Sequence, residues 1–559
     1  LNFDTGVDLS DAGYSLAGYT FFRDNTDIAA VNGVFLNTYL SNVVGYLLTK
    51  LPFGGRMLGM NFYTSLLVSA LALLGYRFFI TKMPAWIAFV SQLLAVSLCW
   101  CPTVVLYNYL TYLLFLLGAI CLFRGLVGTK TSWLVAAGAC LGVNVFVRTP
   151  NILEAALIFC LWYYAWLRRK KRSVVVRETL LCLAGYLGAV VVMSVPMIIH
   201  LGASAPLEMI GGLFQISASN SGYTFAGMLR SIFSAYLSGG KWLLLMALCV
   251  LPGFPFMQMR WGGALPKKII YCLAIVFLFY ALSRIGMYNF EYYQKFSNLQ
   301  WVVVFLLLSL VNIIWMLFSS HVDVHWKLLA SMGLVIIIVT PLGSNNYLWP
   351  LVGNLFFLAP LTVWHIYKLV RYAPPFVGTE RFKLPLFPLK AMLAAILMAV
   401  FVQSLGLGIF YVYRDGEDGA ARQTRIAGNE VLRGMRTTAA NAAALQEITA
   451  FTQQYSADTD LILFGNIPAL SYYLNRRSAL SSSWPLLDSF ATAQFVSELD
   501  NLGGWVDIKG RARPLIVFAA EDNIPDWATV PEKQAALVAF MAKYGYKEVF
   551  RNSEFIVYL

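Results

Sequence analysis

Residues 299–318 read LQWVVVFLLLSLVNIIWMLF, twenty consecutive residues without a charged side chain. A helix of about 20 apolar residues covers roughly 30 Å, which is the hydrocarbon thickness of a bilayer. Similar apolar stretches recur along the first 413 residues, and the sequence therefore predicts a polytopic α-helical membrane protein. The twelve visible spans are expected at 58–80, 85–101, 105–123, 133–147, 152–167, 179–200, 242–259, 269–285, 299–318, 328–342, 350–369 and 391–413.

The composition divides the chain into a membrane part and a soluble part. Of the 559 residues, 59% are hydrophobic and 12% are charged, whereas soluble domains are about 45–50% apolar and about 25% charged. The last 146 residues differ, since they hold 17 acidic and 14 basic residues. We expect a first outer loop with interfacial helices (1–57), a transmembrane helical domain (58–413) and a C-terminal α/β extracytoplasmic domain (414–559). One further span is expected before Leu1, which would make thirteen.

The net charge of +13 is a topology signal, because the membrane part carries 27 Lys/Arg against 11 Asp/Glu. Sorting the loops by alternate sides of the membrane puts 19 Lys/Arg on one side and eight on the other. By the positive-inside rule, the basic run 168–177 lies in the cytoplasm, whereas 1–57 and the C-terminal domain lie outside. No nucleic-acid partner is expected.

The segments outside the spans carry their own patterns. Aromatic and aliphatic residues at helical spacing predict a surface helix over 31–51, and the Gly/Ser-rich stretch 202–240 predicts a long polar loop. The C-terminal domain alternates strands with helices, which favours a small α/β fold. Its helices are expected at 422–455, 468–474, 491–501 and 531–544, its strands at 460–464 and 515–519, and a terminal hairpin at 547–559.

The acidic segment 4–17 reads DTGVDLSDAGYSLA and places Asp4, Asp8 and Asp11 at the membrane boundary, directly before a surface helix. A structural interpretation exists for each carboxylate: Asp11 can cap the helix, and a solvated loop accommodates the other two. A functional interpretation is equally open, because a positioned carboxylate can act as a general base.

The string DxxDxGYxLA over residues 8–17, in a first outer loop, resembles the GT-C superfamily of polyprenyl-phosphate-dependent glycosyltransferases. That superfamily includes bacterial aminoarabinose and mannosyl transferases and oligosaccharyltransferases. The likeness extends to the layout of the chain: an acidic first outer loop, about a dozen spans and an outer C-terminal α/β domain. Many members have an Asp-Glu pair where this chain has Asp11 and Ala12, and Asp8 is the candidate to replace the second acid.

The resemblance implies that Asp11 acts as the general base or orients the acceptor, with Asp8 as the second candidate. In some members this loop binds a divalent metal. The sequence leaves the metal dependence of this chain open, and Asp8 and Asp11 are the candidate ligands of a Mg or Mn ion. Tyr14 in the same string is expected to contact the sugar or the acceptor. The bacterial relatives imply a location in the bacterial plasma (inner) membrane.

The turn FVRTPN (146–151) supplies candidates for binding the donor phosphate, namely Arg148 and Asn151. A guanidinium group binds phosphate in a bidentate manner, and the turn resembles the Arg/Lys-x-Pro turn of GT-C proteins. The alternative is a snorkelling Arg148 or an Arg148–Glu154 pair.

Two other outer loops supply candidates for contacts with the sugar or the acceptor. Asn345 and Asn346 lie in the turn PLGSNNY, whose amides and glycine suit a sugar or phosphate site but also suit an ordinary tight turn. Glu291 and Tyr292 lie in an aromatic loop, where rings can stack on sugar faces or form an interfacial belt.

Together these features predict an inverting glycosyltransferase that moves a sugar from a polyprenyl-phosphate donor to a lipid, glycan or protein acceptor at the outer face of the membrane. The expected partners are the lipid-linked donor, membrane lipids and that acceptor. Three alternatives stay open: a membrane transporter or flippase, a polymerase or ligase of lipid-linked polysaccharides, and a GT-C-shaped protein that binds glycan without catalysis. Only Glu154 is acidic within a span interior, which argues against a transporter.

Overall fold

A computed structural model describes residues 3–24, 31–99, 103–128, 130–218, 224–284, 295–344, 346–379, 382–417, 419–487, 489–509 and 513–559.

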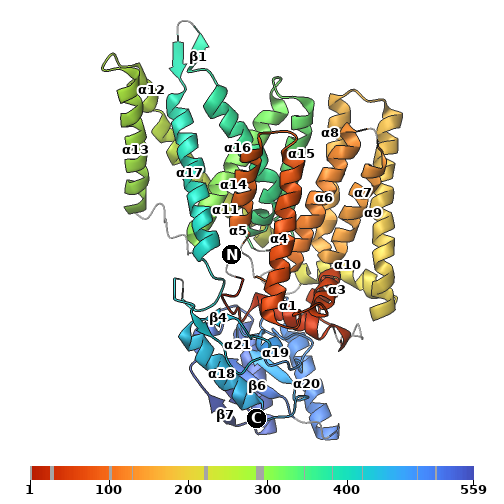
Figure 1. Cartoon of the computed structure of the whole chain (residues 1–559). Coiled ribbons are helices and arrows are strands. Elements are labelled where there is room, and N and C mark those ends of the chain that lie inside the picture. Colours follow the sequence, from red (N-terminus) through yellow and green to blue (C-terminus); the bar gives the residue numbers. More distant parts are fainter. Residues whose placement is uncertain are drawn as a thin grey trace.

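Among these residues, nine helices are long and apolar enough to cross a membrane, by length and composition (Figure 1). They are α4 (Met57–Phe79), α6 (Tyr107–Val127), η3–α8 (Thr149–Leu167), α9 (Arg172–Leu201), α11–α12 (Phe225–Gln258), α13 (Ala264–Arg284), α14 (Lys295–Phe318), η4–α16 (Trp349–Tyr372) and α17 (Phe387–Phe410). Three shorter apolar helices accompany them: α5 (Ala85–Leu98), α7 (Ser132–Val147) and α15 (Val324–Val339). Each of the twelve predicted spans coincides with one of these helices, so the prediction of a polytopic helical protein is confirmed.

Helix α7, which leads into Arg148, packs closely on α9 through glycines. A Cβ atom at Gly138 would lie 1.8 Å from the carbonyl oxygen of Cys182, and one at Gly185 would lie 2.1 Å from that of Val135. Small residues permit such close approach of helices within membranes. This packing fixes the position of the turn that carries Arg148.

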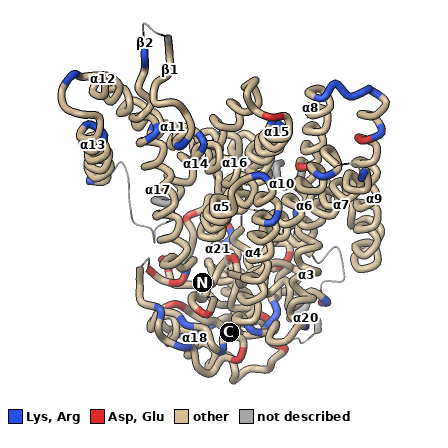
Figure 2. Tube along the Cα trace, turned by 45° about the horizontal axis from the view of Figure 1, so that its top comes forward, with Lys and Arg blue, Asp and Glu red and all other residues tan. Residues whose placement is uncertain are grey.

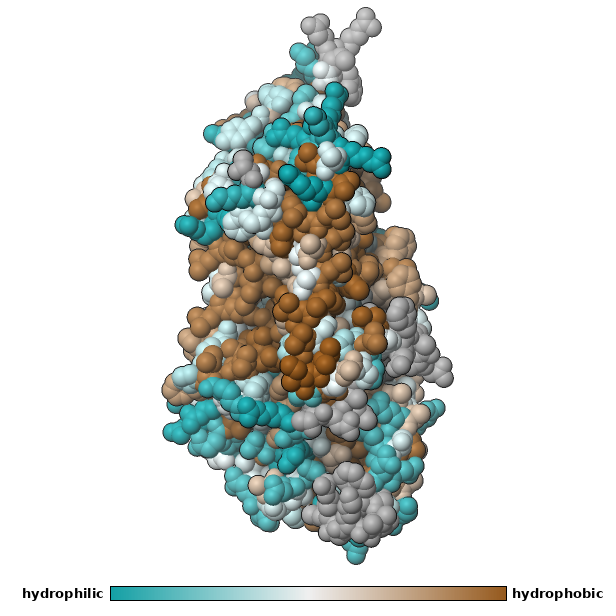
Figure 3. Space-filling model, turned by 90° about the vertical axis from the view of Figure 1, so that its right-hand side faces the viewer, coloured by the Kyte–Doolittle hydropathy of each residue, from teal (hydrophilic) through white to brown (hydrophobic). Residues whose placement is uncertain are grey.

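The face of the helical domain in Figure 3 is an apolar band between two polar ends. Apolar side chains of the spans are exposed, as contact with lipid requires: Ile199 of α9 is 80% exposed and Phe318 of α14 is 84% exposed. The basic connection between α8 and α9 lies at the end of the bundle opposite the C-terminal domain (Figure 2). The hairpin of β1 (Phe376–Thr379) and β2 (Phe382–Pro385) lies at that same end (Figure 1).

The N-terminal segment forms short surface helices between the bundle and the C-terminal domain (Figure 1). The prediction of one helix over 31–51 is wrong in one respect, because Thr38 leaves the helical region (φ −123°, ψ 30°) and separates two helices. The elements are α1 (Asp11–Thr20), η1 (Phe22–Asp24), α2 (Gly33–Asn37) and α3 (Tyr39–Thr49).

The prediction of a polar loop over 202–240 is wrong. Helix α10 (Ala205–Ala218) forms within it, and α11 begins at Phe225, well before the predicted start of the span. Leu229, Phe233 and Leu237 recur every four residues and are exposed on one face of α11, which therefore continues the lipid-facing surface.

The C-terminal domain is a small α/β fold, as predicted. Its four-stranded sheet has the order β5-β6-β8-β7, with β5 and β6 parallel and the other neighbours antiparallel. Alternate residues of β5 enter two different hydrophobic clusters, so both faces of the sheet are covered. The strands are β5 (Leu461–Phe464), β6 (Leu515–Ala519), β7 (Glu548–Arg551) and β8 (Phe555–Tyr558), and the helices are α18 (Ala439–Thr452), α19 (Leu470–Tyr473), α20 (Thr492–Lys509) and α21 (Val530–Tyr544).

The predicted helix over 422–455 is wrong in its first half. Gly428 and Gly434 have φ values of +71° and +92°, which an α-helix excludes. The chain instead forms a short ladder of β3 (Thr424–Arg425) and β4 (Arg436–Thr437) before α18 begins.

Candidate functional site

The acidic N-terminal segment is fastened to the C-terminal domain by backbone hydrogen bonds. Gly6 N donates to Arg436 O at 2.8 Å, and Arg436 N donates to Asp4 O at 2.7 Å, so the segment adds to the β3–β4 ladder. Ala469 N donates to Leu9 O at 3.0 Å. The N-terminal segment and the C-terminal domain therefore form one surface at the end of the bundle.

Asp8 caps helix α1 from within this surface. Its side chain is buried, and its Oδ1 accepts hydrogen bonds from the N–H of Ser10 at 2.8 Å and the hydroxyl of Ser10 at 2.6 Å. Its Oδ2 accepts from Ala12 N at 2.7 Å, which satisfies a donor of the first helical turn. The prediction that Asp11 caps the helix is wrong, because Asp11 is itself the first helical residue.

The environment of Asp8 favours its protonated form. Burial, and after it the Asp11 carboxylate, raises the pKa of Asp8 to about 7. The hydrogen bonds from Ser10 and Ala12 act in the opposite direction and are outweighed. Asp8 is therefore a structural carboxyl group that titrates near neutrality.

We expect Asp8 to make the thermal stability of the protein fall as the pH rises. Because the folded state holds the proton more tightly than the unfolded state, this contribution is complete below about pH 4 and is lost as the pH rises through about 7. The free energy of unfolding should fall by an amount on the order of 4 kcal/mol over this range. The measurement is the Tm, which should be lower at about pH 8 than at about pH 5. Asp8→Asn does not titrate and should flatten this slope; equal slopes would contradict the assignment.

Asp11 has a different environment from Asp8, because its side chain is 40% exposed. Its Oδ2 accepts a hydrogen bond from the hydroxyl of Tyr413 and lies 3.8 Å from a guanidinium nitrogen of Arg414. Arg414 also donates to Ser10 Oγ at 3.0 Å, and its own side chain is 44% exposed. Asp11 is thus held in place by two residues while it stays accessible to a ligand.

Tyr413 and Arg414 were missed by the sequence reasoning. Burial, the Asp11 carboxylate and then the Asp8 carboxylate raise the pKa of Tyr413, although Arg414 lowers it, so the phenol stays a hydrogen-bond donor to Asp11. A signal was present in the sequence. Arg414 is a basic residue directly after the last span, on the side that carries few basic residues.

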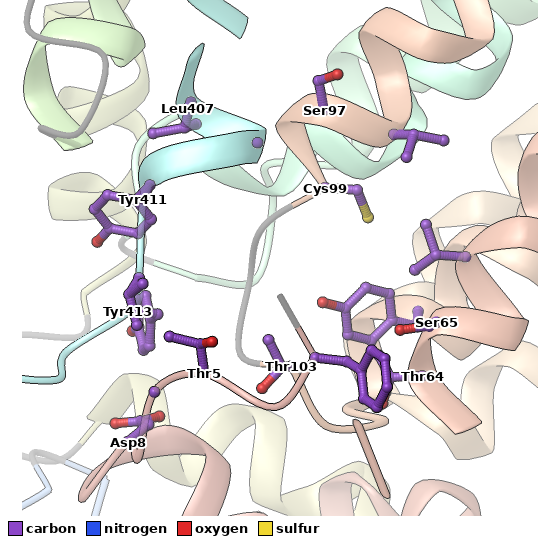
Figure 4. A pocket seen from close by; sticks show the side chains of 17 residues that line it. Thr5, Asp8, Thr64, Ser65, Ser97, Cys99, Thr103, Leu407, Tyr411 and Tyr413 are labelled. Carbon is purple, nitrogen blue, oxygen red and sulfur yellow. The ribbon is translucent and has the colours of Figure 1, made fainter. Parts of the chain in front are cut away.

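A cavity of about 110 Å³ lies beside Asp8 and Tyr413, among the ends of α4, α5 and α17 (Figure 4). Its lining combines apolar side chains of the spans with hydroxyl groups, among them Thr5, Thr64, Ser65 and Ser97. The cavity is therefore amphipathic, with apolar surface and hydroxyl groups in one lining.

A second cavity of about 150 Å³ lies on the other side of the site, between α1, the α2–α3 segment and the C-terminal domain. Tyr14 lines this cavity and packs edge-on against Trp484, with ring centroids 5.9 Å apart. The predicted contact of Tyr14 with sugar or acceptor stays a prediction, and the structure places the residue where such a contact can form.

Arg148 is tied to a second predicted turn. Its guanidinium donates to Gly343 O at 2.6 Å and stacks over the ring of Tyr107 at 5.6 Å. Gly343 has φ +91°, and a Cβ atom there would lie 2.4 Å from the Cβ of Pro150, so glycine is required for the two turns to meet. In the same turn as Gly343, Asn346 is exposed.

Asn151 and Glu154 belong to a buried polar network beneath Arg148. Asn151 Nδ2 donates to Thr111 Oγ1 at 2.8 Å and to Asn144 O at 3.1 Å, and Asn144 Nδ2 donates to Glu154 Oε2 at 2.6 Å. The amide hydrogens of Asn151 are therefore engaged with the protein. Glu154 is hydrogen-bonded to Asn144, and Arg148 is hydrogen-bonded to Gly343. Each side chain therefore has another partner in place of the direct Arg148–Glu154 pair that the sequence left open.

Three other predicted contact residues, Asn345, Glu291 and Tyr292, lie outside the described residues.

The described residues do not fit a Mg or Mn ion shared by Asp8 and Asp11. Both oxygens of Asp8 accept hydrogen bonds from the protein, and the positive charge of Arg414 stands beside Asp11. Asp4, the third acid, pairs with Arg436 at 2.8 Å. A hard cation needs several free oxygen ligands, and no cluster of three or more acidic, His or Cys side chains occurs among the residues described. We derive no step through a metal.

The chain is thus a polytopic helical membrane protein in which the N-terminal segment, the last span and a C-terminal α/β domain form one site. Its shape is similar to that of ArnT from Cupriavidus metallidurans bound to undecaprenyl phosphate (13% identity, TM-score 0.43, 99% of this chain and 94% of that chain). The apo state of the same ArnT has 13% identity and a TM-score of 0.42, and the match covers 98% of this chain and 93% of that chain. The oligosaccharyltransferase of Archaeoglobus fulgidus, solved with Zn and sulfate, has 10% identity and a TM-score of 0.45, and the match covers 92% of this chain and 64% of that chain. No family model and no curated protein matches the sequence. At this identity and TM-score the likeness concerns shape alone.

Proposed function

We propose that this protein is a glycosyltransferase that moves a sugar from a polyprenyl-phosphate donor to an acceptor hydroxyl, at the outer face of a bacterial inner membrane. The observation that carries the proposal is the accessible carboxylate of Asp11, which Tyr413 and Arg414 hold in place. Tyr413 lines one cavity, and Tyr14 and Ser15, one helical turn from Asp11, line another. One cavity lies among the ends of the spans, and the other lies against the C-terminal domain.

The reaction would be a single displacement. Asp11 takes the proton of the acceptor hydroxyl as its oxygen attacks the anomeric carbon of the sugar. The bond from the acceptor oxygen to that carbon forms while the bond from the carbon to the phosphate oxygen breaks, and the polyprenyl phosphate leaves with the bonding electrons. Because the attack comes from the face opposite the leaving group, the configuration inverts. A guanidinium group stabilises the charge that develops on the phosphate.

Arg414 is the guanidinium group that best suits the donor phosphate. It lies next to the proposed base, is 44% exposed, and directly follows Tyr413, which lines the cavity among the spans. Arg148 is the alternative from the sequence, with Asn151 beside it. Arg148 already donates to Gly343 O, and the amide of Asn151 is buried in its network.

A reconstitution experiment tests the function and separates the two arginines. The full chain in liposomes, supplied with polyprenyl-phosphate sugars and with glycan or lipid acceptors that carry free hydroxyl groups, should consume donor, release polyprenyl phosphate and form glycosylated acceptor. We expect Arg414→Gln to weaken donor binding by about 10- to 100-fold, as the loss of a charge-assisted contact implies, and Arg148→Gln to weaken it less. A larger loss of donor binding in Arg148→Gln than in Arg414→Gln would assign the phosphate site to Arg148. Transport of a solute by the liposomes without turnover of the donor would show that the protein is a transporter and not a glycosyltransferase.

A further inference from the structure

The cavity between α1 and the C-terminal domain has the chemistry of a binding site for a neutral, polyhydroxyl ligand. Its volume of about 150 Å³ is below the roughly 300–1,000 Å³ of sites for drug-sized ligands, so it suits one small ring. Its lining comes from four separate parts of the chain: residues 14–24, residues 32–42, Tyr107 at the start of α6, and residues 471–483.

Hydroxyl groups of this cavity keep some capacity to accept hydrogen bonds. Thr38 Oγ1 donates to Val34 O at 2.8 Å and accepts from Asn42 Nδ2 at 3.2 Å. Ser478 Oγ donates to Ser482 O at 3.1 Å and accepts from Leu480 N at 3.2 Å. A hydroxyl oxygen has two lone pairs, so each of the two keeps one that can accept from a ligand. The lining therefore matches a ligand that carries several hydroxyl donors.

Charge at the cavity is balanced. Asp24 and Arg477 both line it, and Arg477 Nε lies 3.8 Å from Asp24 Oδ2, so each offsets the other. A ligand with a net charge would gain little there and would lose its hydration. The rings of Tyr14 and Tyr107 supply aromatic surface in the same lining, which an apolar face of a sugar ring can contact.

On α1 the lining of the cavity begins at Tyr14, about one helical turn after Asp11. Residues 11, 15 and 18 are spaced as i, i+4 and i+7 and so share one face of the helix. Ser15 and Gly18 line the cavity. A ring held against Ser15 lies about one turn of helix, roughly 5–6 Å, from Asp11, and a hydroxyl group on that ring spans this distance.

We propose that this cavity binds one neutral sugar ring of a glycan acceptor and directs one of its hydroxyl groups towards Asp11. The identification of the ligand as the acceptor rests on the proposed function. The binding of a neutral sugar rests on the cavity alone.

Gly18 offers a direct test, because it lines the cavity in the middle of a helix. A Cβ atom there would meet only Asn42 Oδ1, at 3.3 Å, so a larger side chain can enter the cavity without striking backbone. Gly18→Leu should fill the site. The matched control is Gly188→Leu, since Gly188 is also within a helix and a Cβ atom there would meet nothing within 4 Å. Thr38→Val removes one acceptor and guards against misfolding of the first variant.

The experiment is saturation-transfer NMR on the purified full chain in nanodiscs, with the methyl glycosides of glucose, galactose and mannose, and with glucuronate as a charged probe. We expect at least one neutral glycoside to bind the wild type and Gly188→Leu equally, and glucuronate not to bind. Binding should fall about tenfold or more in Gly18→Leu and in Thr38→Val. Binding of no neutral glycoside to the wild type, or unchanged binding to Gly18→Leu, would overturn the proposal. Because the NMR experiment contains no donor and measures glycoside binding alone, a failure of the transfer function leaves the glycoside signal intact.

Discussion

Replacement of Asp11 by asparagine is expected to lower the rate of sugar transfer by about 10²–10⁴-fold, the usual contribution of a general base. Asparagine keeps the size of the side chain and can still accept a hydrogen bond from Tyr413, but it cannot take a proton from the acceptor. Because Asp11 is half-exposed and Asp8 performs the capping, the fold should tolerate the change. The measurement is donor turnover by purified protein in liposomes, with Tm and donor binding determined in parallel.

The matched control for this variant is Asp4→Asn. Asp4 belongs to the same acidic segment, but its carboxylate pairs with Arg436, whereas Tyr413 and Arg414 hold Asp11. Its loss removes a partly exposed ion pair, which contributes about 0–1 kcal/mol to stability. We expect transfer by Asp4→Asn within a few-fold of the wild type. If both variants turned over donor at similar rates, Asp11 would not be the base.

The spans could be predicted from the sequence because each is a local feature, about twenty apolar residues that any bilayer requires. The strand 515–519 was recognisable for a similar reason, since it is a short apolar run bounded by polar residues. The structure of the first half of 422–455 could not be predicted in this way. Its composition suits a helix, and only the positive φ values of Gly428 and Gly434 exclude a helix.

The candidate site was predictable only in part. The acidic segment was identified from its spacing. The different roles of its two carboxylates depend on burial, because Asp8 is buried and caps the helix whereas Asp11 is half-exposed and accessible. Tyr413 lies 402 positions from Asp11 in the sequence, and only the folded chain brings the two together. Contacts of this range carry no local pattern.

Replacement of Gly13 by alanine is expected to separate the N-terminal segment from the C-terminal domain. Gly13 lies in α1 against Ala469, and a Cβ atom there would lie 1.9 Å from Ala469 Cβ and 2.3 Å from Ala469 Cα. Backbone cannot yield as a flexible side chain does, so the two elements must move apart, at a cost of about 1–3 kcal/mol or more. The loss should lower the Tm and the rate of transfer, because the same contact places Asp11 near Arg414.

Gly18→Ala in the same helix is the matched comparison. With it, the direction of the change in Tm tells whether the contact with Ala469 or helix propensity decides the stability of Gly13→Ala. Alanine stabilises a helix relative to glycine by about 1 kcal/mol, and the new Cβ atom at position 18 would meet only the side-chain oxygen of Asn42 at 3.3 Å. Helix propensity alone would therefore raise the Tm of both variants. We expect it to rise or stay level for Gly18→Ala and to fall for Gly13→Ala, with faster proteolysis of the linking residues 414–438. A Tm for Gly13→Ala at or above that of Gly18→Ala would show that α1 does not dock on Ala469, and the shared surface on which Asp11 and Arg414 meet would lose its support.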